Sequence, residues 1–291
     1  MEQVRAPLAA VIVLYGQRFS ETSADSSLLK AATEELRHIF VYDNSPTIDN
    51  EGSEELSALG ITMHYLHDPS NGGLVPAYNW ACEKAGDAGC EWILLLDQHA
   101  TLPGNYLRLF CQSLHLLPQD VVAATSYICS GARRLSPQWV YKGIALPWPI
   151  KPGLVGPQRR ELVSINSGTF VNISHIRNRG GWDRRYKLDA VDFWFFADVY
   201  RSGNRVALLP CEIQHALSVA NLSQVDVQRF ENIVGAESAF YRHMRPRSTQ
   251  IAAGMLCLAR ACKHFMHGHR ALAKIGAHEA LKLLKAKRTA S

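Results

Sequence analysis

Acidic and histidine side chains stand at points in this sequence where they could act on a bound ligand. In residues 91–100, an apolar run of strand length stops at Asp97, and His99 follows two positions later. Such a run predicts a buried strand, which places Asp97 at a carboxyl end, where open α/β sheets bind ligands. Alternate residues at a strand end can both reach a ligand and its metal. We therefore expect Asp97 and His99 to act together, although His99 could instead be a structural histidine at the edge of the site.

Further carboxylates have comparable settings. Asp43 ends another apolar run and is followed by the turn-prone residues Asn44-Ser45-Pro46, which would aim the carboxylate outward or form an Asx turn or helix cap. Asp189 and Asp192 are three positions apart, so on a helix they would share a face and each could raise the pKa of the other. The alternative is that both are first-turn acids favoured by the helix dipole.

The elements that must hold these residues alternate in type along the chain. Apolar periodicity predicts strands at residues 8–15, 38–43, 61–66, 92–97, 121–128 and 205–209, and helices at residues 74–88 and 106–116. This alternation predicts a mostly parallel sheet with helices on both faces. Residues 130–158 are rich in Pro, Gly, Arg and Trp, and we expect a long loop there.

Charge is distributed unevenly along the 291 residues. Residues 240–291 hold eleven Lys and Arg but only one acid, Glu279, which leaves 20 basic and 25 acidic residues in 1–239, a net charge of −5. Seven cysteines without a C-x-x-C pair, and no apolar run of membrane-spanning length, favour a reduced cytoplasmic protein. With an acidic body and no recognised binding motif, nucleic acid is not an expected partner.

Several ordered motifs resemble those of family 2 glycosyltransferases, and the likeness covers roughly residues 8–220. It is strongest to bacterial rhamnosyltransferases of cell-surface polysaccharide synthesis, whose motif usually reads Asp-Gln-Asp where this chain has Asp97-Gln98-His99. The motifs are Val11-Ile12-Val13-Leu14-Tyr15, Val41-Tyr42-Asp43-Asn44-Ser45, Asn71-Gly72-Gly73 with Asn79, Leu95-Leu96-Asp97-Gln98-His99, Asn166-Ser167-Gly168-Thr169, Gly180-Gly181-Trp182-Asp183, Asp189-Ala190-Val191-Asp192 and His215.

The resemblance implies a nucleotide-sugar-binding GT-A-type fold and assigns roles to these residues. Asp43 would contact the pyrimidine base of the donor, and Asp97 would lie near the ribose and a divalent cation. His99 and His215 would complete the site for that metal, and Asp192, with Asp189 beside it, would be the general base. The remaining donor-side residues implied are Asn71, Gly72, Gly73, Asn79, Ser167 and Gly168.

Two departures from the family pattern bear on activity. Imidazole is a poor partner for Mg²⁺ but suits Mn²⁺, so His99 leaves the identity of the cation open. Many relatives carry an acid two positions after the second Asp of the 189–192 motif, where this chain has Trp194. The alternative interpretation is therefore a catalytically degenerate protein that keeps the fold for glycan or partner recognition.

The basic tail predicts amphipathic helices. One apolar stripe comprises Met255, Leu258, Cys262 and Phe265, and a second comprises Ala273, Ala277, Ala280 and Leu284. Such helices can lie on anionic membranes or pack on the catalytic domain with a solvated basic face. We thus expect a catalytic domain over 1–239 with a helical tail over 240–291. The expected function is inverting transfer of a sugar, with dTDP-rhamnose the leading donor, to a cell-surface glycan or lipid-linked acceptor, in the cytoplasm or at the inner face of its membrane.

Overall fold

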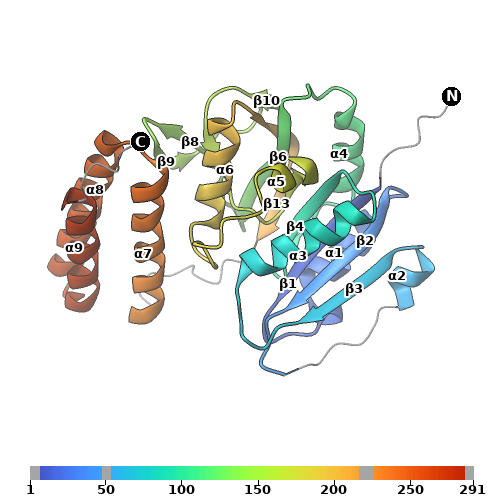
Figure 1. Ribbon diagram of the computed structural model, residues 1–291, viewed down its shortest axis with the longest axis horizontal. Coiled ribbons are helices and arrows are strands. Elements are labelled where there is room, and N and C mark those ends of the chain that lie inside the picture. The colour runs from blue at the N-terminus through green and yellow to red at the C-terminus, as the bar shows by residue number, and fades with distance from the viewer. Residues whose placement is uncertain (1–6, 48–53, 216–225, 286–291) are drawn as a thin grey trace.

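A mixed sheet with helices on both faces forms the body of the protein, as a computed structural model describes it for residues 7–47, 54–215 and 226–285 (Figure 1). The described strands are β1 (Leu8–Leu14), β2 (Leu36–Asp43), β3 (Thr62–His67), β4 (Trp92–Asp97), β5 (Ala100–Thr101), β6 (Val121–Ser130), β7 (Arg133–Ser136), β8 (Gln138–Tyr141), β9 (Ile144–Pro149), β10 (Gly156–Gln158), β11 (Leu162–Val163), β12 (Thr169–Asn172) and β13 (Arg205–His215). The described helices are α1 (Ser23–Ala31), α2 (Glu54–Ala58), α3 (Leu74–Asp87), α4 (Tyr106–Leu114), α5 (Ile173–Asn178), α6 (Val191–Arg201), α7 (Val227–Met244), α8 (Arg247–Met266) and α9 (Arg270–Lys285), with a 3-10 turn at Phe19–Glu21.

The main sheet has the order β10-β13-β6-β12-β4-β1-β2-β3, with β5 paired to β13 and β7 to β6. Along this path β1, β2, β3, β4, β6 and β13 run in one direction, and β12 and β10 run against them. The parallel core therefore matches the expected fold, with β12 inserted antiparallel between β4 and β6.

Strand β1 lies between the two strands that end at Asp43 and Asp97. All seven of its residues are buried, because one face packs with α3, α5 and α6 and the other with α1 and α4. Two-sided burial is why such strands read as continuous apolar runs. The strand pairs Leu14 with Asp43 on one side and Val13 with Asp97 on the other. The two carboxylates thus end the strands on either side of β1, at the same carboxyl-terminal end of the sheet.

The long loop expected over residues 130–158 is wrong. This stretch contains β7, β8, β9 and β10, and β8 and β9 form a hairpin closed by Lys142 and Gly143. Both turn residues have positive φ, +49° and +82°, which is the geometry that suits the twist of a two-residue hairpin. Lys-Gly is not one of the usual sequence signals for that turn, and for this reason the sequence did not predict the hairpin.

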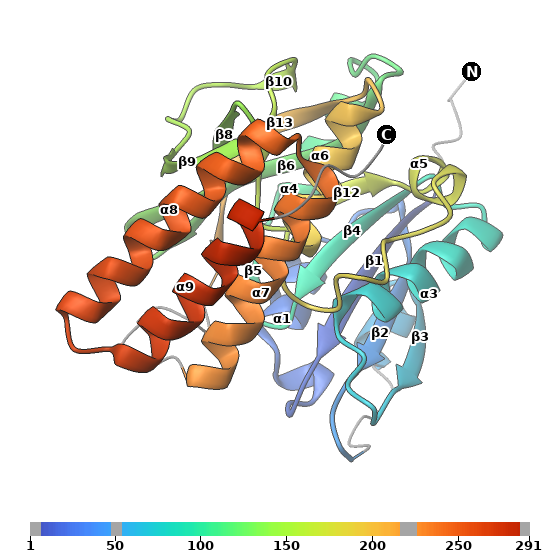
Figure 2. The same ribbon diagram turned by 60° about the vertical axis from the view of Figure 1, so that its left-hand side comes forward.

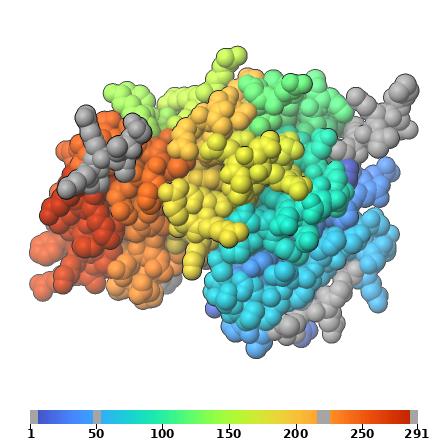
Figure 3. Space-filling view, in the orientation of Figure 1, coloured from blue at the N-terminus to red at the C-terminus, as the bar shows by residue number. Residues whose placement is uncertain are grey.

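Three helices at the C-terminal end form a layer beside the body (Figures 1 and 2). They share a small core of their own, made of Phe230, Val234, Cys257, Leu272 and Ala280. Helix α7 crosses residue 240, so the expected division between catalytic domain and tail lies inside a helix. In the space-filling view, α7 packs directly against the segment that contains α6 (Figure 3).

The two apolar stripes of the tail have different environments. On α9, Ala273 and Ala280 are buried, as expected for a helix that packs on the rest of the protein. On α8, Met255 and Phe265 are each 63% exposed, and Leu258 and Cys262 are exposed as well. Across the described residues, no helix has the length and apolar character needed to span a membrane.

Candidate active site

Asp43 lies in a pocket of about 370 Å³ at the end of β2, whose lining also includes Gly16, Arg18 and Ser45. Its carboxylate accepts hydrogen bonds from the Ser45 amide at 2.9 Å and from the Tyr65 hydroxyl at 2.6 Å. Burial would raise the pKa of Asp43, but these hydrogen bonds hold it below its usual value. Asp43 is thus a fixed, charged acceptor in an Asx-type turn that also lines a pocket.

The segment Asn71-Gly72-Gly73 is shaped by close backbone contact. Gly73 has φ +89°, and a Cβ there would lie 2.5 Å from the carbonyl oxygen of Lys187. That same oxygen accepts the amides of Leu74 and Val75, the first residues of α3. The loop between α5 and α6 therefore lies against Gly73 and accepts the first amides of α3. This loop runs along α3 in Figure 2.

Asn79 is engaged elsewhere on α3. Its side-chain oxygen accepts the Trp182 amide at 2.7 Å, and its nitrogen donates to the Trp182 carbonyl at 3.2 Å. Trp182 is 2% exposed and packs in the core against Trp194. Asn79 thus fixes the turn before α6 and lies apart from the other candidate residues. Trp194, which stands where relatives have an acid, is a core residue.

Asp97 and His215 meet at the carboxyl ends of β4 and β13. His215 Nε2 lies 3.1 Å from Asp97 Oδ2, and the hydroxyl of Ser167 accepts the Asp97 amide at 3.0 Å. Gly168 is a glycine for a steric reason, since a Cβ at its φ of +82° would lie 2.2 Å from Ile213. The strand of Asp97 is therefore held in register with the residues that surround its carboxylate.

The donor set for a cation is sparse. His99 is exposed, and its Nε2 lies 3.3 Å from the side-chain nitrogen of Gln98. Strand β5 pairs Ala100 with His215, which brings the turn that contains His99 beside β13. Within the described residues, no three His, Cys, Asp or Glu side chains form a group that could hold a metal. Asp97 and His215 do converge, and the buried Nδ1 of His215 lacks a described partner. Of the side chains that the structure describes, Asp97 and His215 thus supply two of ligand type at this strand end, fewer than the three that a protein-held metal site needs.

Asp192 lies in the first turn of α6 and lines a second pocket of about 370 Å³ together with Asp97, Asn166 and Ser167. The pKa of Asp192 is raised to about 6, mainly by burial and in smaller part by the charges of Asp189 and Asp97, against the lowering effect of a backbone hydrogen bond from Phe193. A carboxylate with a pKa near neutrality can take up a proton during a reaction.

The expectation that Asp189 shares a helix face with Asp192 is wrong. Helix α6 begins at Val191, because Ala190 has φ +60°, a left-handed conformation that is uncommon outside glycine. Asp189 therefore precedes the helix, and Arg229 of α7 holds its carboxylate through both oxygens. The effect of Asp189 on Asp192 remains electrostatic.

Some residues of this second pocket were not predicted. Ile233 and Glu237 of α7 and Arg260 of α8 form its far wall. Tyr78, which no motif marks, and Asn166, which belongs to the 166–169 motif, line it as well. The Tyr78 hydroxyl and the Asn166 side-chain oxygen are buried without a hydrogen-bond partner in the described part of the chain, and a ligand or an ordered water can supply one. No motif marks Arg229, Glu237 or Arg260, because their approach to the site depends on the packing of α7 and α8.

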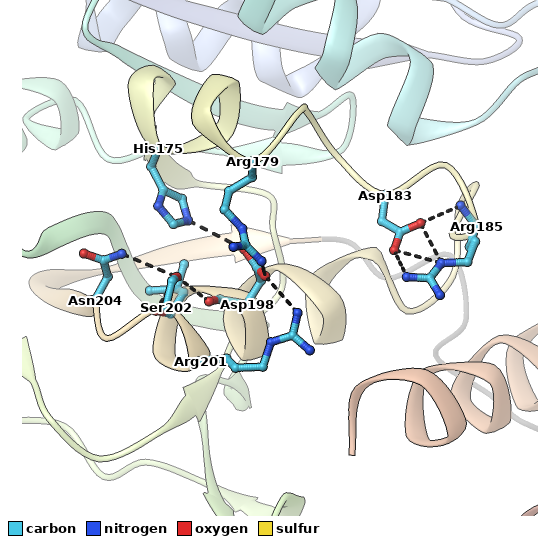
Figure 4. Close-up of polar contacts among 9 residues, drawn as sticks. His175, Arg179, Asp183, Arg185, Asp198, Arg201, Ser202 and Asn204 are labelled. Carbon is cyan, nitrogen blue, oxygen red and sulfur yellow. Dashed lines mark hydrogen bonds and ion pairs between the residues drawn. The ribbon is translucent and has the colours of Figure 1, made fainter. Parts of the chain in front are cut away.

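Helix α6 is anchored at its far end by Asp198, which is 1% exposed (Figure 4). Its carboxylate accepts a hydrogen bond from Arg179 at 2.9 Å, and Arg201 lies 3.6 Å away. On the loop before α6, Arg185 donates to the Asp183 carboxylate at 3.0 Å, as Figure 4 shows.

A larger pocket, about 470 Å³, lies at the opposite end of the strands. It is lined by Leu8, Trp92 and Val121, which begin β1, β4 and β6. It contains none of the candidate residues, so the chemistry is assigned to the carboxyl ends of the strands.

Comparisons with known proteins identify the family and a similar fold. A family model described as glycosyl transferase family 2 matches residues 25–179. No curated protein sequence matches the chain. Solved structures of S. aureus TarS are similar: the full structure at 12% identity and TM-score 0.51, covering 96% of this chain and 54% of that one, so this chain spans about half of it. Residues 1–349 of TarS with UDP-GlcNAc match at 12% identity and TM-score 0.53, covering 96% and 90%. At these identities the likeness concerns the fold alone.

Proposed function

Because the chain belongs to glycosyl transferase family 2, we propose that it moves rhamnose from dTDP-rhamnose to a hydroxyl of a cell-surface glycan or lipid-linked acceptor, with inversion at the anomeric carbon. The observation that carries this proposal is that Asp97 and Asp192 line one pocket, with the pKa of Asp192 raised to about 6. One carboxylate then faces the donor while the other is poised to accept a proton.

Each residue has a place in the proposed step. Asp43 binds the pyrimidine base, and Asp97 lies by the ribose and diphosphate. Asp192 takes the proton of the acceptor hydroxyl while the oxygen of that hydroxyl forms a bond to the anomeric carbon. The bond from the anomeric carbon to the diphosphate breaks at the same time, and the nucleoside diphosphate leaves. Asn71, Gly72 and Gly73 border the nucleotide in this proposal, and Ser167 and Gly168 support the sugar side.

A divalent cation, Mn²⁺ or Mg²⁺, is part of the proposal. Asp97 and His215 would contribute two ligands, and His99 would have to turn towards them from Gln98 to supply a third. When bound, the cation would neutralise charge on the leaving diphosphate. The imidazoles favour Mn²⁺ over Mg²⁺.

The donor class is tested by calorimetric titration with dTDP, UDP, dTDP-rhamnose and UDP-GlcNAc, each with Mn²⁺, with Mg²⁺ and with EDTA. Tighter binding of dTDP-rhamnose supports the proposed donor, whereas a preference for UDP-GlcNAc, which a TarS structure contains, replaces rhamnose with that sugar. Failure to bind any nucleotide would favour the alternative, a degenerate protein used for glycan recognition.

We also propose that the C-terminal helices bring the enzyme to an anionic membrane surface, where a lipid-linked acceptor would lie. The exposed stripe on α8 includes Met255, Leu258 and Phe265. The exposed cations Lys263 and Arg270 lie within its span and five residues after its end, respectively. An apolar stripe beside cationic side chains is the pattern that binds anionic bilayers. Peripheral attachment at the inner face of the cytoplasmic membrane would follow.

The membrane proposal is tested by cosedimentation with vesicles of phosphatidylcholine with or without phosphatidylglycerol. We expect binding to the anionic vesicles, and its loss in Leu258→Glu and Phe265→Glu. The matched control is Leu116→Glu, which charges a residue that is 83% exposed beyond the C-terminal end of α4. Equal loss in the control, or binding independent of phosphatidylglycerol, would reject the surface on α8.

A further inference from the structure

Arg229 connects the C-terminal helices to the pocket acids. It lies on α7, and its guanidinium binds both carboxylate oxygens of Asp189, one of them at 2.7 Å. The side chains are 34% and 16% exposed, so the pair is partly shielded from solvent. A two-pronged arginine–carboxylate pair fixes orientation as well as charge.

The segment that this pair holds carries the base into the pocket. Three residues after Asp189, Asp192 stands in the first turn of α6, and Ala190 between them adopts a left-handed conformation. Two residues before Asp189, the Lys187 carbonyl accepts both leading amides of α3. Segment 187–192 is therefore held at two points, by α3 on one side and by Arg229 of α7 on the other.

The charges around Asp192 come from several elements. Asp97 on β4 and Asp189 both repel a charge on Asp192. Burial, together with the charges of Asp97 and Asp192, raises the pKa of Tyr78 on α3. Across the pocket, Glu237 and Arg260 pair with each other at 3.0 Å. Arg229 is thus the cation that directly compensates Asp189.

We propose that Arg229 is a positioning residue for the transfer: by clamping Asp189 it presents Asp192 to the pocket and keeps the Asp189 carboxylate from competing for the acceptor proton. The inference rests on the proposed role of Asp192 as the base. In this proposal α7 contributes to catalysis by positioning the base, and the C-terminal helices belong to the catalytic unit.

The experiment follows the carboxyl titration of Asp192 by NMR in protein labelled with ¹³C at aspartate, assigned with Asp192→Asn. In Arg229→Met we expect the midpoint to rise by about one pH unit, because the charge of Asp189 loses its partner. Asp189→Asn should lower the midpoint, and the double variant should match Asp189→Asn. Arg229→Lys, which keeps the charge but not the two-pronged geometry, should lie between the wild type and Arg229→Met.

The control is Arg205→Met, which removes a two-pronged pair with Asp120 far from the pocket, at the start of β13. It should leave the titration of Asp192 unchanged even if it lowers the melting temperature. An unmoved midpoint in Arg229→Met, or a double variant unlike Asp189→Asn, would overturn the proposal.

A turnover assay supplies the second reading. A one-unit rise in midpoint predicts about tenfold slower turnover on the acid side of the pH profile for Arg229→Met, with little change in the KM for the donor. The NMR titration needs no substrate, so it tests the role of Arg229 independently of the proposed donor. An error in the proposed donor would appear instead as absent nucleotide binding in the wild type.

Discussion

Replacing Asp192 with Asn should stabilise the protein while abolishing turnover. In the folded protein the pKa of Asp192 is raised from 3.8 to about 6, so between these values the folded state binds more protons than the unfolded state. The wild type therefore loses stability as the pH rises through that window, and the loss is complete above it. An Asn side chain never carries the charge and escapes this cost.

The size of the effect follows from the shift. A difference of about two pH units corresponds to about 3 kcal/mol in the free energy of unfolding near pH 7.5, and about 0.5 kcal/mol near pH 4. For a chain of this size, 3 kcal/mol corresponds to a rise of about 5–10 °C in melting temperature. The Phe193 amide can still bond the Asn oxygen, so the local hydrogen bond that Asp192 accepts is preserved.

The assay is thermal unfolding of wild type and Asp192→Asn at both pH values, with dTDP titration to show that the donor site is intact. Asp189→Asn is the matched control, since it removes a carboxylate paired with Arg229 and should bring no gain. A variant that is less stable than wild type near pH 7.5, or equally stabilised at both pH values, would refute the burial argument. Retained turnover would remove Asp192 from the role of base.

Further predictions concern the pocket walls and the donor. Asp43→Ala should weaken dTDP binding at least about tenfold in calorimetry, because a charged acceptor leaves the base pocket; unchanged affinity would exclude contact with the base. Tyr78→Phe should leave the melting temperature unchanged or raise it, since the buried hydroxyl has no described partner, yet slow turnover; a lowered melting temperature would mean that the hydroxyl is bonded within the protein. Gly73→Ala should destabilise by more than Gly180→Ala in urea unfolding, because both have positive φ but only Gly73 is covered by the Lys187 carbonyl; equal losses would mean that backbone strain alone matters.

The sequence allowed much of the parallel core to be predicted because its signals are local. Apolar runs ending at Asp43 and Asp97 gave the strands and, with them, the edge of the sheet where these carboxylates lie. The order of motifs indicated the family that the profile match supports. These features depend on neighbours in the chain, which periodicity detects.

What could not be predicted depends on contacts between distant segments. The hairpin at Lys142 and Gly143 packs on α8, where Thr249 donates to the Lys142 carbonyl at 2.9 Å. The pairing of Arg229 with Asp189 spans 40 positions. The start of α6 at Val191 follows from one left-handed residue, Ala190, whose type gives no signal for it.

The carbonyl of Lys187 limits how far the loop between α5 and α6 can move. It satisfies two amides of α3 and rests on Gly73, so lifting the loop between α5 and α6 would break both bonds and expose two backbone donors. At about 1 kcal/mol for each hydrogen bond, with more for any donor left dry, such lifting is disfavoured. The loop therefore behaves as a fixed rim and not as a hinged cover. Substrate exchange must then proceed past the rim, and any closing movement would have to arise in another part of the chain.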